Sequence, residues 1–451
     1  MNRRKFLKNA LTLAALTPVA KVSTALAASE NNTQASSASV TQKKPRPTAF
    51  IYGATMMHLS DLEVQDKVMR CLKTVENNLF HPGTNLIYDY LTSWDSARKF
   101  DHLPTPVEIS RCLPNPCSWR SGQEDSVING GVALDMYINS NNGEMARKIY
   151  QGLRLCGTVS GIPGFVARSI SPRDGKSFYP ESSRDQYTHY VYALWHYFHS
   201  DLSSKEEKRE IVKLLTDVAN FCEKHVTKEN NWTLPRADGN PHRSSVCRMW
   251  ESQAHEIARL PMFYAAAWSV SGNDRYLKCF NRYAYEAAER SMNLYSKSYR
   301  SFALMQMTLS CRLIHDLAPD ATLKQKYAQV MDLIDEYLNF NLLRAGTNCN
   351  TADFSAMMPN WHTIKRAEVI TDCGYTLPER PEALQLAFQT IRDCTESIIA
   401  ALLMPTPRVT LLRRRIFRAV LKTLTPEKHC TFAPLFFPAA WYLAKHRNVE
   451  L

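Results

Sequence analysis

The stretch "YPESSRDQYTHYVYALWHYF", residues 179–198, shows how this chain is built. Its large apolar residues recur at intervals of three and four, the spacing that places side chains on one face of an α-helix. Ser183 and Gln186 stand three apart at its start, which predicts a capping box around the first turn. The stretch therefore predicts an amphipathic helix over about 184–199, with an aromatic stripe facing the core.

The beginning of this helix also carries polar groups that a core stripe does not need. Arg184, Asp185 and His189 lie close together, directly after a long loop that contains Gly, Pro and charged residues. Asp185 in the first turn would interact favourably with the helix dipole, so helix stability alone could account for it. The alternative is that this helix end forms the wall of a binding site in which Asp185 has a functional role.

The same helical spacing runs through most of the chain, whereas strand patterns are scarce. We expect helices over about 62–80, 84–98, 122–140, 143–158, 184–199, 204–226, 248–270, 274–295, 297–317, 321–342, 382–404, 408–423 and 433–446. They follow one another in pairs, which suggests an open solenoid or a ring closed on itself. No repeat of fixed period is visible, which argues against an open array. The sequence predicts an all-α fold, an (α/α)6 toroid of paired helices.

Longer connections between these helices are expected at about 99–121, 159–183, 227–247 and 343–381. Long loops in a compact domain are usually functional or disordered, and these contain too many aromatic residues for disorder. We therefore expect them to line one face of the toroid, with the site in the bowl where the inner helices begin.

The first 27 residues are typical of an export signal. The first eight residues contain four basic residues, all of them in the run RRKFLK at 3–8. An apolar stretch follows, and then the small residues ALA at 25–27. This arrangement resembles a bacterial twin-arginine signal peptide, and an ordinary secretory signal is the alternative. Residues 28–48 are rich in Ser, Thr, Asn, Gln and Ala, which predicts a disordered linker. We expect residues 49–451 to form the catalytic toroid, located in the periplasm or secreted.

Composition narrows the choice of partners. Removing the basic residues of the signal (Arg3, Arg4, Lys5, Lys8 and Lys21) lowers the net charge from +12 to +7. A mildly basic exported protein favours acidic partners such as anionic polysaccharide or lipid head groups. Export argues against a nucleic-acid partner, and no apolar run after the signal is long enough to cross a bilayer.

Twelve cysteines are too few for a disulfide framework in a chain of 451 residues. Cys112 and Cys117 could bridge a small loop after export, whereas most of the others fall in helical patterns where buried thiols are expected. The cysteines lack the paired spacing of a zinc site, and no loop has the dense carboxylate pattern that would indicate calcium. We therefore expect no metal and no other cofactor.

A second helix start, "SWRSGQEDSVINGG" at residues 118–131, repeats the arrangement around Asp185. Ser121 and Glu124 have the spacing of a capping box. Three further candidates flank this box: Trp119, Arg120 and Asp125. Gly130 and Gly131 inside the predicted helix indicate that a neighbouring helix or a ligand comes close to the helix backbone there.

A third cluster lies in "NPHRSSVCRMWESQAHEIARLP", residues 240–261. Here Trp250 begins a predicted helix on which Glu251, His255 and Arg259 recur every four residues along one face. They could form a solvated ladder of charges or belong to a site together with two residues of the preceding loop, His242 and Arg243. The pattern lacks the third ligand and the spacing of a zinc hydrolase. A fourth, weaker cluster is "NWHTIKR", with Trp361, His362 and Arg366.

These clusters share a charged helix start flanked by Trp or Tyr, which suits a carbohydrate. Aromatic faces stack on sugar rings, and Arg or His could neutralise the carboxylate of a uronic acid or a sulfate. Inverting glycoside hydrolysis needs two carboxyl groups about 6.5–9.5 Å apart, one protonated and one ionised. We expect Asp185 and Glu251 to be this pair, with Glu124 or Asp125 as substitutes. The candidates for substrate binding are Trp119, Arg120, Glu124, Asp125, Arg184, Tyr187, His189, His242, Arg243, Trp250, His255, Trp361 and His362.

The helical layout and the segment "SSRDQYTHYVYALWHYF" resemble the (α/α)6-barrel glycosidases that act on uronic acid sugars, including the unsaturated glucuronyl and rhamnogalacturonyl hydrolases. In those families an Asp at the start of an inner helix, followed by aromatic residues, acts as general acid and base. The resemblance implies that role for Asp185. The other signature segments of these families are not recognisable in this chain.

Two alternatives remain open at the level of sequence. The first is a polysaccharide lyase on the same fold, in which a Tyr or His removes a proton beside a uronate carboxylate. Its candidate residues are Tyr187, His189, Arg243 and His255. The second is a non-catalytic protein that binds glycans or a partner, with the basic helix at 408–423 resting on an anionic membrane or simply exposing one charged face to water.

Overall fold

The computed structural model of the protein describes residues 59–240, 245–295, 299–366 and 374–451, all within one compact unit, Arg46–Leu451. The predicted signal peptide and linker lie outside the described residues. Within them the regular secondary structure is mostly helical, and the sheet consists of the two short antiparallel strands β1 (Phe80–His81) and β2 (Leu86–Ile87).

Six helices of the described chain form a closed inner ring. They are α5 (Ser126–Asn139), α7 (Arg184–His199), α9 (Arg259–Ser271), α11 (Ser301–Leu317), α13 (Glu382–Leu403) and α15 (Phe436–His446). Each packs against the next in this order, and α15 packs against α5, so the ring closes on itself. These helices bury residues around most of their circumference, as expected for helices covered on both sides.

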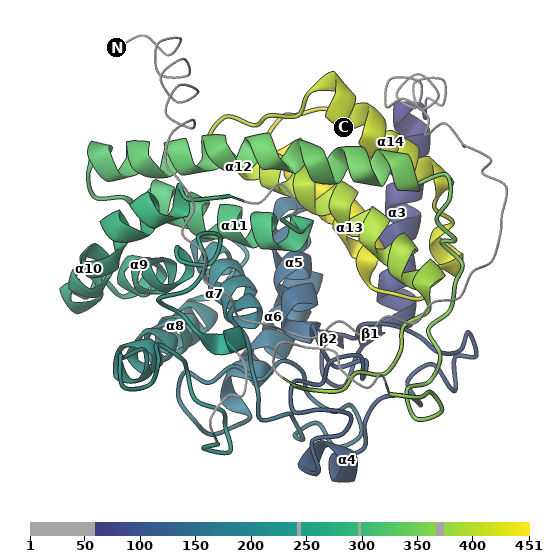
Figure 1. The fold of residues 1–451 in the computed structure, drawn as a ribbon, viewed down its shortest axis with the longest axis horizontal. Helices are drawn as coiled ribbons and strands as arrows, with labels where there is room; N and C mark the ends of the chain where they lie inside the picture. The colour runs from purple at the N-terminus through teal and green to yellow at the C-terminus, as the bar shows by residue number, and fades with distance from the viewer. Residues whose placement is uncertain (1–58, 241–244, 296–298, 367–373) are drawn as a thin grey trace, which may run out of the picture. The chain divides into compact units, whose positions relative to one another are not determined.

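Six further helices in the described residues form an outer layer. They are α3 (Asp61–Asn78), α6 (Gly143–Thr158), α8 (Lys205–His225), α10 (Asp274–Ser291), α12 (Ala321–Asn348) and α14 (Leu411–Thr423). Each packs against at least one inner helix, and Figure 1 shows the long helix α12 lying along α11 and α13. Their buried residues follow the three-and-four spacing of a single stripe. The predicted (α/α)6 toroid is therefore confirmed.

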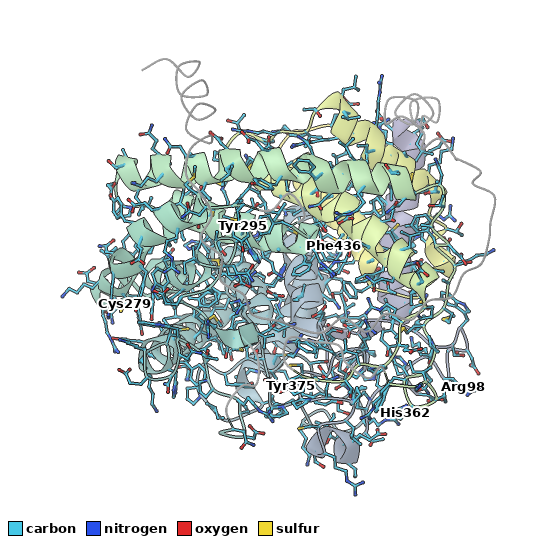
Figure 2. All side chains as sticks on the ribbon, viewed as in Figure 1. Arg98, Cys279, Tyr295, His362, Tyr375 and Phe436 are labelled. Carbon is cyan, nitrogen blue, oxygen red and sulfur yellow. The ribbon has the colours of Figure 1, made fainter. Side chains whose placement is uncertain are left out.

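Shorter helical segments connect these layers. They are α4 (Pro106–Ser110) and the 3₁₀ helices η1 (Ser245–Cys247), η2 (Pro426–Lys428) and η3 (Ala433–Leu435). Helix α4 begins with a capping box between Thr105 and Glu108. Figure 2 labels Tyr375 and His362 among the loops in the lower part of the view, below the helices of the toroid.

Gly130 and Gly131 allow α5 to pack closely against two neighbouring helices. A Cβ atom at Gly131 would lie 2.9 Å from Cβ of His189 and 3.0 Å from its carbonyl oxygen, on α7. A Cβ atom at Gly130 would lie 2.9 Å from Cδ2 of Leu153, on α6. Helices, rather than a ligand, therefore account for these two glycines.

Two of the predicted helices are wrong because tertiary pairing holds the backbone in other conformations. Within the predicted helix 84–98, strand β2 pairs with β1. The segment after β2 pairs with the chain before η3, where the backbone N–H of Leu91 donates to Cys430 O at 2.7 Å. In the predicted helix 248–270, Met249 N donates to Trp232 O at 2.8 Å. The helix there begins only at Arg259, so the predicted ladder of Glu251, His255 and Arg259 does not form.

The start of α5 also differs from the prediction. The helix begins at Ser126 with Asp125 in the N-cap position, and the predicted capping box of Ser121 and Glu124 is absent. Glu124 Oε2 accepts instead from the backbone N–H of Arg120 at 3.0 Å. At α7, Ser183 caps the helix by accepting from Gln186 N at 3.5 Å, as predicted, while the Gln186 side chain is used elsewhere.

Cys112 and Cys117 do not form the disulfide considered from the sequence. The Cys117 thiol is buried and donates to the carboxylate of Glu181 at 3.0 Å. All cysteines of the described ranges are free, and most are buried in the helical core. The loop around them is therefore held by hydrogen bonds rather than by a covalent link.

Four arginines on or before helix α14 make ion pairs within the protein. The pairs are Arg408 with Asp332, Arg413 with Asp335, Arg414 with Glu450, and Arg418 with Asp61. These contacts join α14 to α12, to α3 and to the C-terminal residues, which gives the basic residues a structural role. Across the described helices, none combines the length and apolar character that crossing a bilayer requires.

Candidate functional site

A cavity of about 460 Å³ lies at the N-terminal ends of the inner helices. The starts of α7 and α9 contribute Arg184, Asp185 and Arg259. Further along the ring, α11 contributes Phe302 and Gln306, and the first turns of α13 contribute several more side chains. The remaining walls come from loops, including the segment before α5. This is the bowl of the toroid, where the sequence predicts the site.

Asp185 is an ionised carboxylate on the wall of this cavity. Its Oδ1 accepts a hydrogen bond from Nη1 of Arg259 at 2.6 Å, and the side chain is 32% exposed. Burial would raise the pKa of Asp185, but the positive charges of Arg259 and Arg184 outweigh burial and lower it. Asp185 is therefore available as a base or a nucleophile across the neutral pH range.

Asp125 lies in the same cavity under the opposite electrostatic conditions. Its Oδ1 accepts from Nε2 of Gln186 at 3.0 Å and lies 3.6 Å from Nη2 of Arg168. Burial and the negative charge of Glu124 raise the pKa of Asp125 to about 7, although Arg168 acts against them. Asp125 can therefore carry a proton near neutral pH.

Asp89 is a buried acidic residue of the cavity that was not predicted from the sequence. Its carboxylate accepts from the backbone N–H of Glu124 at 2.5 Å and of Asp125 at 3.1 Å. Burial, followed by the charges of Asp125 and Glu124, raises the pKa of Asp89 well above its usual range. Asp89 therefore holds the loop that presents Asp125. It was missed because it fell inside the wrongly predicted helix 84–98.

Arginine is the most frequent charged residue around the cavity. Within the described chain, the lining arginines are Arg120, Arg168, Arg184, Arg259, Arg300, Arg380 and Arg392. Four of them have a carboxylate partner: Arg168 with Asp125, Arg184 with Glu256, Arg259 with Asp185, and Arg392 with Glu396. The lining carboxyl groups are Asp89, Glu124, Asp125, Asp185 and Glu256. The cavity therefore has an excess of positive charge.

Arg392 was also missed from the sequence, because it lies in the interior of helix α13. Its Nε donates to Glu396 Oε1 at 2.7 Å, and Oε2 of Glu396 accepts from Ser301 Oγ at 2.6 Å. Four phenylalanine rings surround the guanidinium, with centroids 5.3–5.8 Å from Cζ: Phe302, Phe388, Phe432 and Phe436. These contacts hold the Arg392 guanidinium rigidly in the wall of the cavity.

His255 is a neutral histidine at one edge of the cavity. Burial lowers the pKa of His255 to about 4, although the nearby Glu256 carboxylate acts in the opposite direction. Its Nδ1 is buried and has no hydrogen-bond partner among the described residues. An adjoining cavity of about 340 Å³ is also lined by His255, Arg300 and Phe302, together with Tyr295 and Tyr299.

The residues predicted from the sequence divide into those inside and those outside the cavity. Those that line it are Trp119, Arg120, Glu124, Asp125, Arg184, Asp185 and His255. His242 and Arg243 lie outside the described residues. Glu251, which was expected to be one of the two catalytic carboxylates, lies outside the cavity. Its side chain is 53% exposed and pairs with Arg290 at 3.3 Å.

The other predicted binding residues lie in the core or at a separate surface. Tyr187 is buried and donates to Gly164 O at 3.2 Å. Trp250 is buried against Tyr283, with ring centroids 4.7 Å apart. His189 lines a separate cavity of about 50 Å³.

Trp361 and His362 also serve a different part of the structure. Trp361 donates from Nε1 to His102 O at 2.6 Å, and the two rings of Trp361 and His362 stack on each other. Nε2 of His362 lies 2.9 Å from Glu108 Oε1, on helix α4. Their contacts connect the fourth cluster to the loop region around α4 rather than to the cavity.

No group of three or more potential metal-ligating His, Cys, Asp or Glu side chains occurs in the described residues. Asp89, Glu124 and Asp125 lie close together, but two backbone N–H groups and the arginines satisfy them. The described side chains of the cavity therefore form a network of carboxylates and guanidiniums.

No family model matches the chain, and no curated protein matches it. Among solved structures, the chain is similar to a glycoside hydrolase family 76 mannosidase from Bacteroides thetaiotaomicron, with a TM-score of 0.42 and 8% sequence identity. The similarity covers 85% of this chain and 99% of that chain. At this level of similarity, any reaction has to be argued from the cavity itself.

Proposed function

We propose that the protein is a glycoside hydrolase that cleaves saccharides containing uronic acid. The observation that carries this proposal is a pair of carboxyl groups in one cavity whose surroundings shift their pKa values in opposite directions. Burial and Glu124 raise the pKa of Asp125 to about 7, whereas Arg259 and Arg184 keep Asp185 ionised. Glycosidases need such a pair, one carboxylic acid and one carboxylate.

In this proposal Asp125 is the general acid, which donates its proton to the oxygen of the leaving group. Asp185 is the ionised partner, which either activates a water molecule or attacks the anomeric carbon. Gln186 supports this arrangement because its side chain bonds to Asp125 from the residue next to Asp185. Asp125 thereby replaces Glu251 as the expected partner of Asp185.

The charge of the cavity favours an acidic substrate. The lining arginines outnumber the lining carboxyl groups in the described chain, and the high pKa values of Asp89 and Asp125 reduce the negative charge further. A neutral sugar would leave this positive charge uncompensated, whereas the carboxylate of a uronic acid would pair with it.

A polysaccharide lyase is the second candidate, and one observation favours it. His255 lines the arginine-rich cavity with a pKa of about 4, so it is neutral and able to accept a proton at neutral pH. In a lyase it would remove the proton beside a uronate carboxylate that an arginine neutralises. A protein that only binds glycans would have the same cavity and no turnover.

We also propose export by the twin-arginine route, on the basis of the run RRKFLK and the apolar stretch after it. Replacement of Arg3 and Arg4 by lysine should hold the protein inside the cell when fractions are compared by immunoblot. Unchanged export of this variant would contradict the proposed route and would favour an ordinary secretory signal.

The reaction is tested by incubating the protein without its signal, residues 28–451, with saturated and unsaturated uronic acid oligosaccharides. New reducing ends and the ultraviolet absorbance of the unsaturated uronyl double bond are followed together. New reducing ends with constant absorbance on saturated substrates, or with falling absorbance on unsaturated ones, support hydrolysis. Rising absorbance on saturated substrates identifies a lyase. No change on any substrate contradicts both enzymatic proposals and favours a binding protein.

A further inference from the structure

Three of the cavity arginines, Arg120, Arg300 and Arg380, have no carboxylate partner among the described residues, and the charges of Arg120 and Arg380 act on each other. Both line the cavity, Arg120 from the loop before α5 and Arg380 from the segment directly before α13. Arg120 Nη1 donates to Pro378 O at 2.6 Å, and Arg380 Nη1 donates to Gln385 Oε1 at 2.9 Å. Neither forms an ion pair with a carboxylate of the described residues, in contrast to the four paired arginines of the same cavity.

The backbone at Arg120 is strained and firmly held. Its φ angle is 60°, in the left-handed region that residues other than glycine rarely adopt. Tyr90 donates from its hydroxyl to Arg120 O at 2.8 Å, and Arg120 N donates to Glu124 Oε2 at 3.0 Å. Strained residues fixed by their surroundings in this way cluster at ligand-binding sites.

Arg380 is held by an aromatic ring that it shares with Arg392. Its guanidinium lies over the ring of Phe388, with Cζ 5.1 Å from the centroid, and Cζ of Arg392 lies 5.3 Å from the same centroid. Arg392 is paired with Glu396, so its charge is compensated. Arg380 is held by this ring and by its hydrogen bond to Gln385, and it has no carboxylate partner among the described residues.

The positive charges of Arg120 and Arg380 act against each other. Burial and the positive charge of Arg380 lower the pKa of Arg120. The charges of Glu124, Tyr90 and Glu379 act in the opposite direction, but neither carboxylate lies within ion-pair distance of Arg120. Two neighbouring cations in a cavity are unfavourable when the site is empty. An anion bound between them removes that repulsion.

We propose that Arg120 and Arg380 together bind the carboxylate of a uronic acid residue of the substrate. Two planar guanidinium groups match a carboxylate in shape as well as in charge. Trp119, which also lines the cavity, precedes Arg120 and supplies an aromatic surface for the sugar ring. The loop from Arg120 to Asp125 links this subsite to the general acid. The inference deepens the proposed function, but it concerns binding and holds whether or not a bond is cleaved.

The test is isothermal titration calorimetry with short galacturonate and glucuronate oligosaccharides and with their carboxyl-reduced, neutral counterparts. Arg120→Gln and Arg380→Gln should each weaken binding of the acidic oligosaccharides about 10- to 100-fold, as expected for the loss of a charged hydrogen bond. Binding of the neutral counterparts should not change. Arg380→Lys keeps the charge without the planar fork and should give an intermediate affinity for the acidic oligosaccharides.

Arg98→Gln is the matched control, because Arg98 is exposed, lies outside the cavity and carries the same charge. It should bind as the wild type does, and circular dichroism should show that all variants keep the helical fold. Wild-type affinity for acidic oligosaccharides in both Arg120→Gln and Arg380→Gln would overturn the inference. So would a wild-type protein that does not distinguish acidic from neutral oligosaccharides. Absence of turnover in the wild type together with these binding changes would contradict the proposed hydrolase and still support the inference.

Discussion

Arg259 donates a hydrogen bond to Asp185 at 2.6 Å, and this pair joins the first turns of two neighbouring inner helices, α7 and α9. The contact has a chemical consequence, because the Arg259 charge is the main influence that lowers the pKa of Asp185 against the effect of burial. Asp125, in the same cavity, has no cation so close and keeps a pKa of about 7. Helix packing therefore determines which carboxyl group is ionised.

The pH dependence of activity should reflect these two carboxyl groups. Activity should fall as the pH rises through about 7, because Asp125 then loses the proton that it has to donate. It should also fall below the ordinary carboxyl range, about pH 4, because Asp185 becomes protonated only there. The measurement is kcat/KM against pH on a cleaved oligosaccharide. A rate that continues to rise above pH 8 would contradict the role of Asp125 as the acid.

Arg259 should set the acidic side of this profile. In Arg259→Met the pKa of Asp185 should rise, because burial then acts without the opposing charge, and the acidic limb of kcat/KM should move to higher pH. Arg259→Lys keeps a positive charge and should move the limb less. If both variants lose activity and the pH profile of kcat/KM keeps its shape, the role of Arg259 is structural and the predicted effect on Asp185 is contradicted.

The two glycines of α5 should respond differently to alanine. In Gly131→Ala the new methyl group meets the backbone of His189, so we expect a loss of about 1–3 kcal/mol in the free energy of unfolding. In Gly130→Ala it meets only the end of the Leu153 side chain, which can move, and a gain of up to about 1 kcal/mol in helix propensity offsets the contact. Urea denaturation of the two variants gives the comparison. Equal stability of both would contradict the close packing of α5 on α7.

Glu251→Gln should leave activity within roughly twofold of the wild type, because the side chain is exposed and outside the cavity. Glu124→Gln should change activity more, because Glu124 raises the pKa of Asp125 and accepts from the backbone of Arg120. The measurement is the initial rate of each variant on the same oligosaccharide, compared with the wild-type rate. A loss in Glu251→Gln as large as that in an Asp185 variant would restore the pair first expected from the sequence.

The toroid could be predicted because helical periodicity depends on local spacing. The aromatic stripe of α7 and the cap at Ser183 are readable in a single stretch, and most other helices show the same pattern. The two failures, at 84–98 and 248–258, are segments whose backbone bonds go to distant parts of the chain, such as Met249 to Trp232. Local spacing contains no information about such partners.

The residues of the candidate site could be predicted only where the cavity coincides with a helix start. Asp125, Arg184 and Asp185 were found because they stand at or beside N-caps, among aromatic and charged neighbours. Asp89 and Arg392 were missed because nothing local distinguishes them, and their partners are set by the closing of the ring. The choice of Glu251 over Asp125 depended on a helix that does not form.

The most direct test of the central claim is the rate of reducing-end release from a uronic acid oligosaccharide by Asp125→Asn and Asp185→Asn. Each of these two variants should lose about 100- to 10,000-fold in kcat while remaining folded. Asp201→Asn, at an exposed position after the far end of α7, should keep the wild-type rate. Wild-type rates in either cavity variant would contradict the assignment of Asp125 and Asp185 as the catalytic pair.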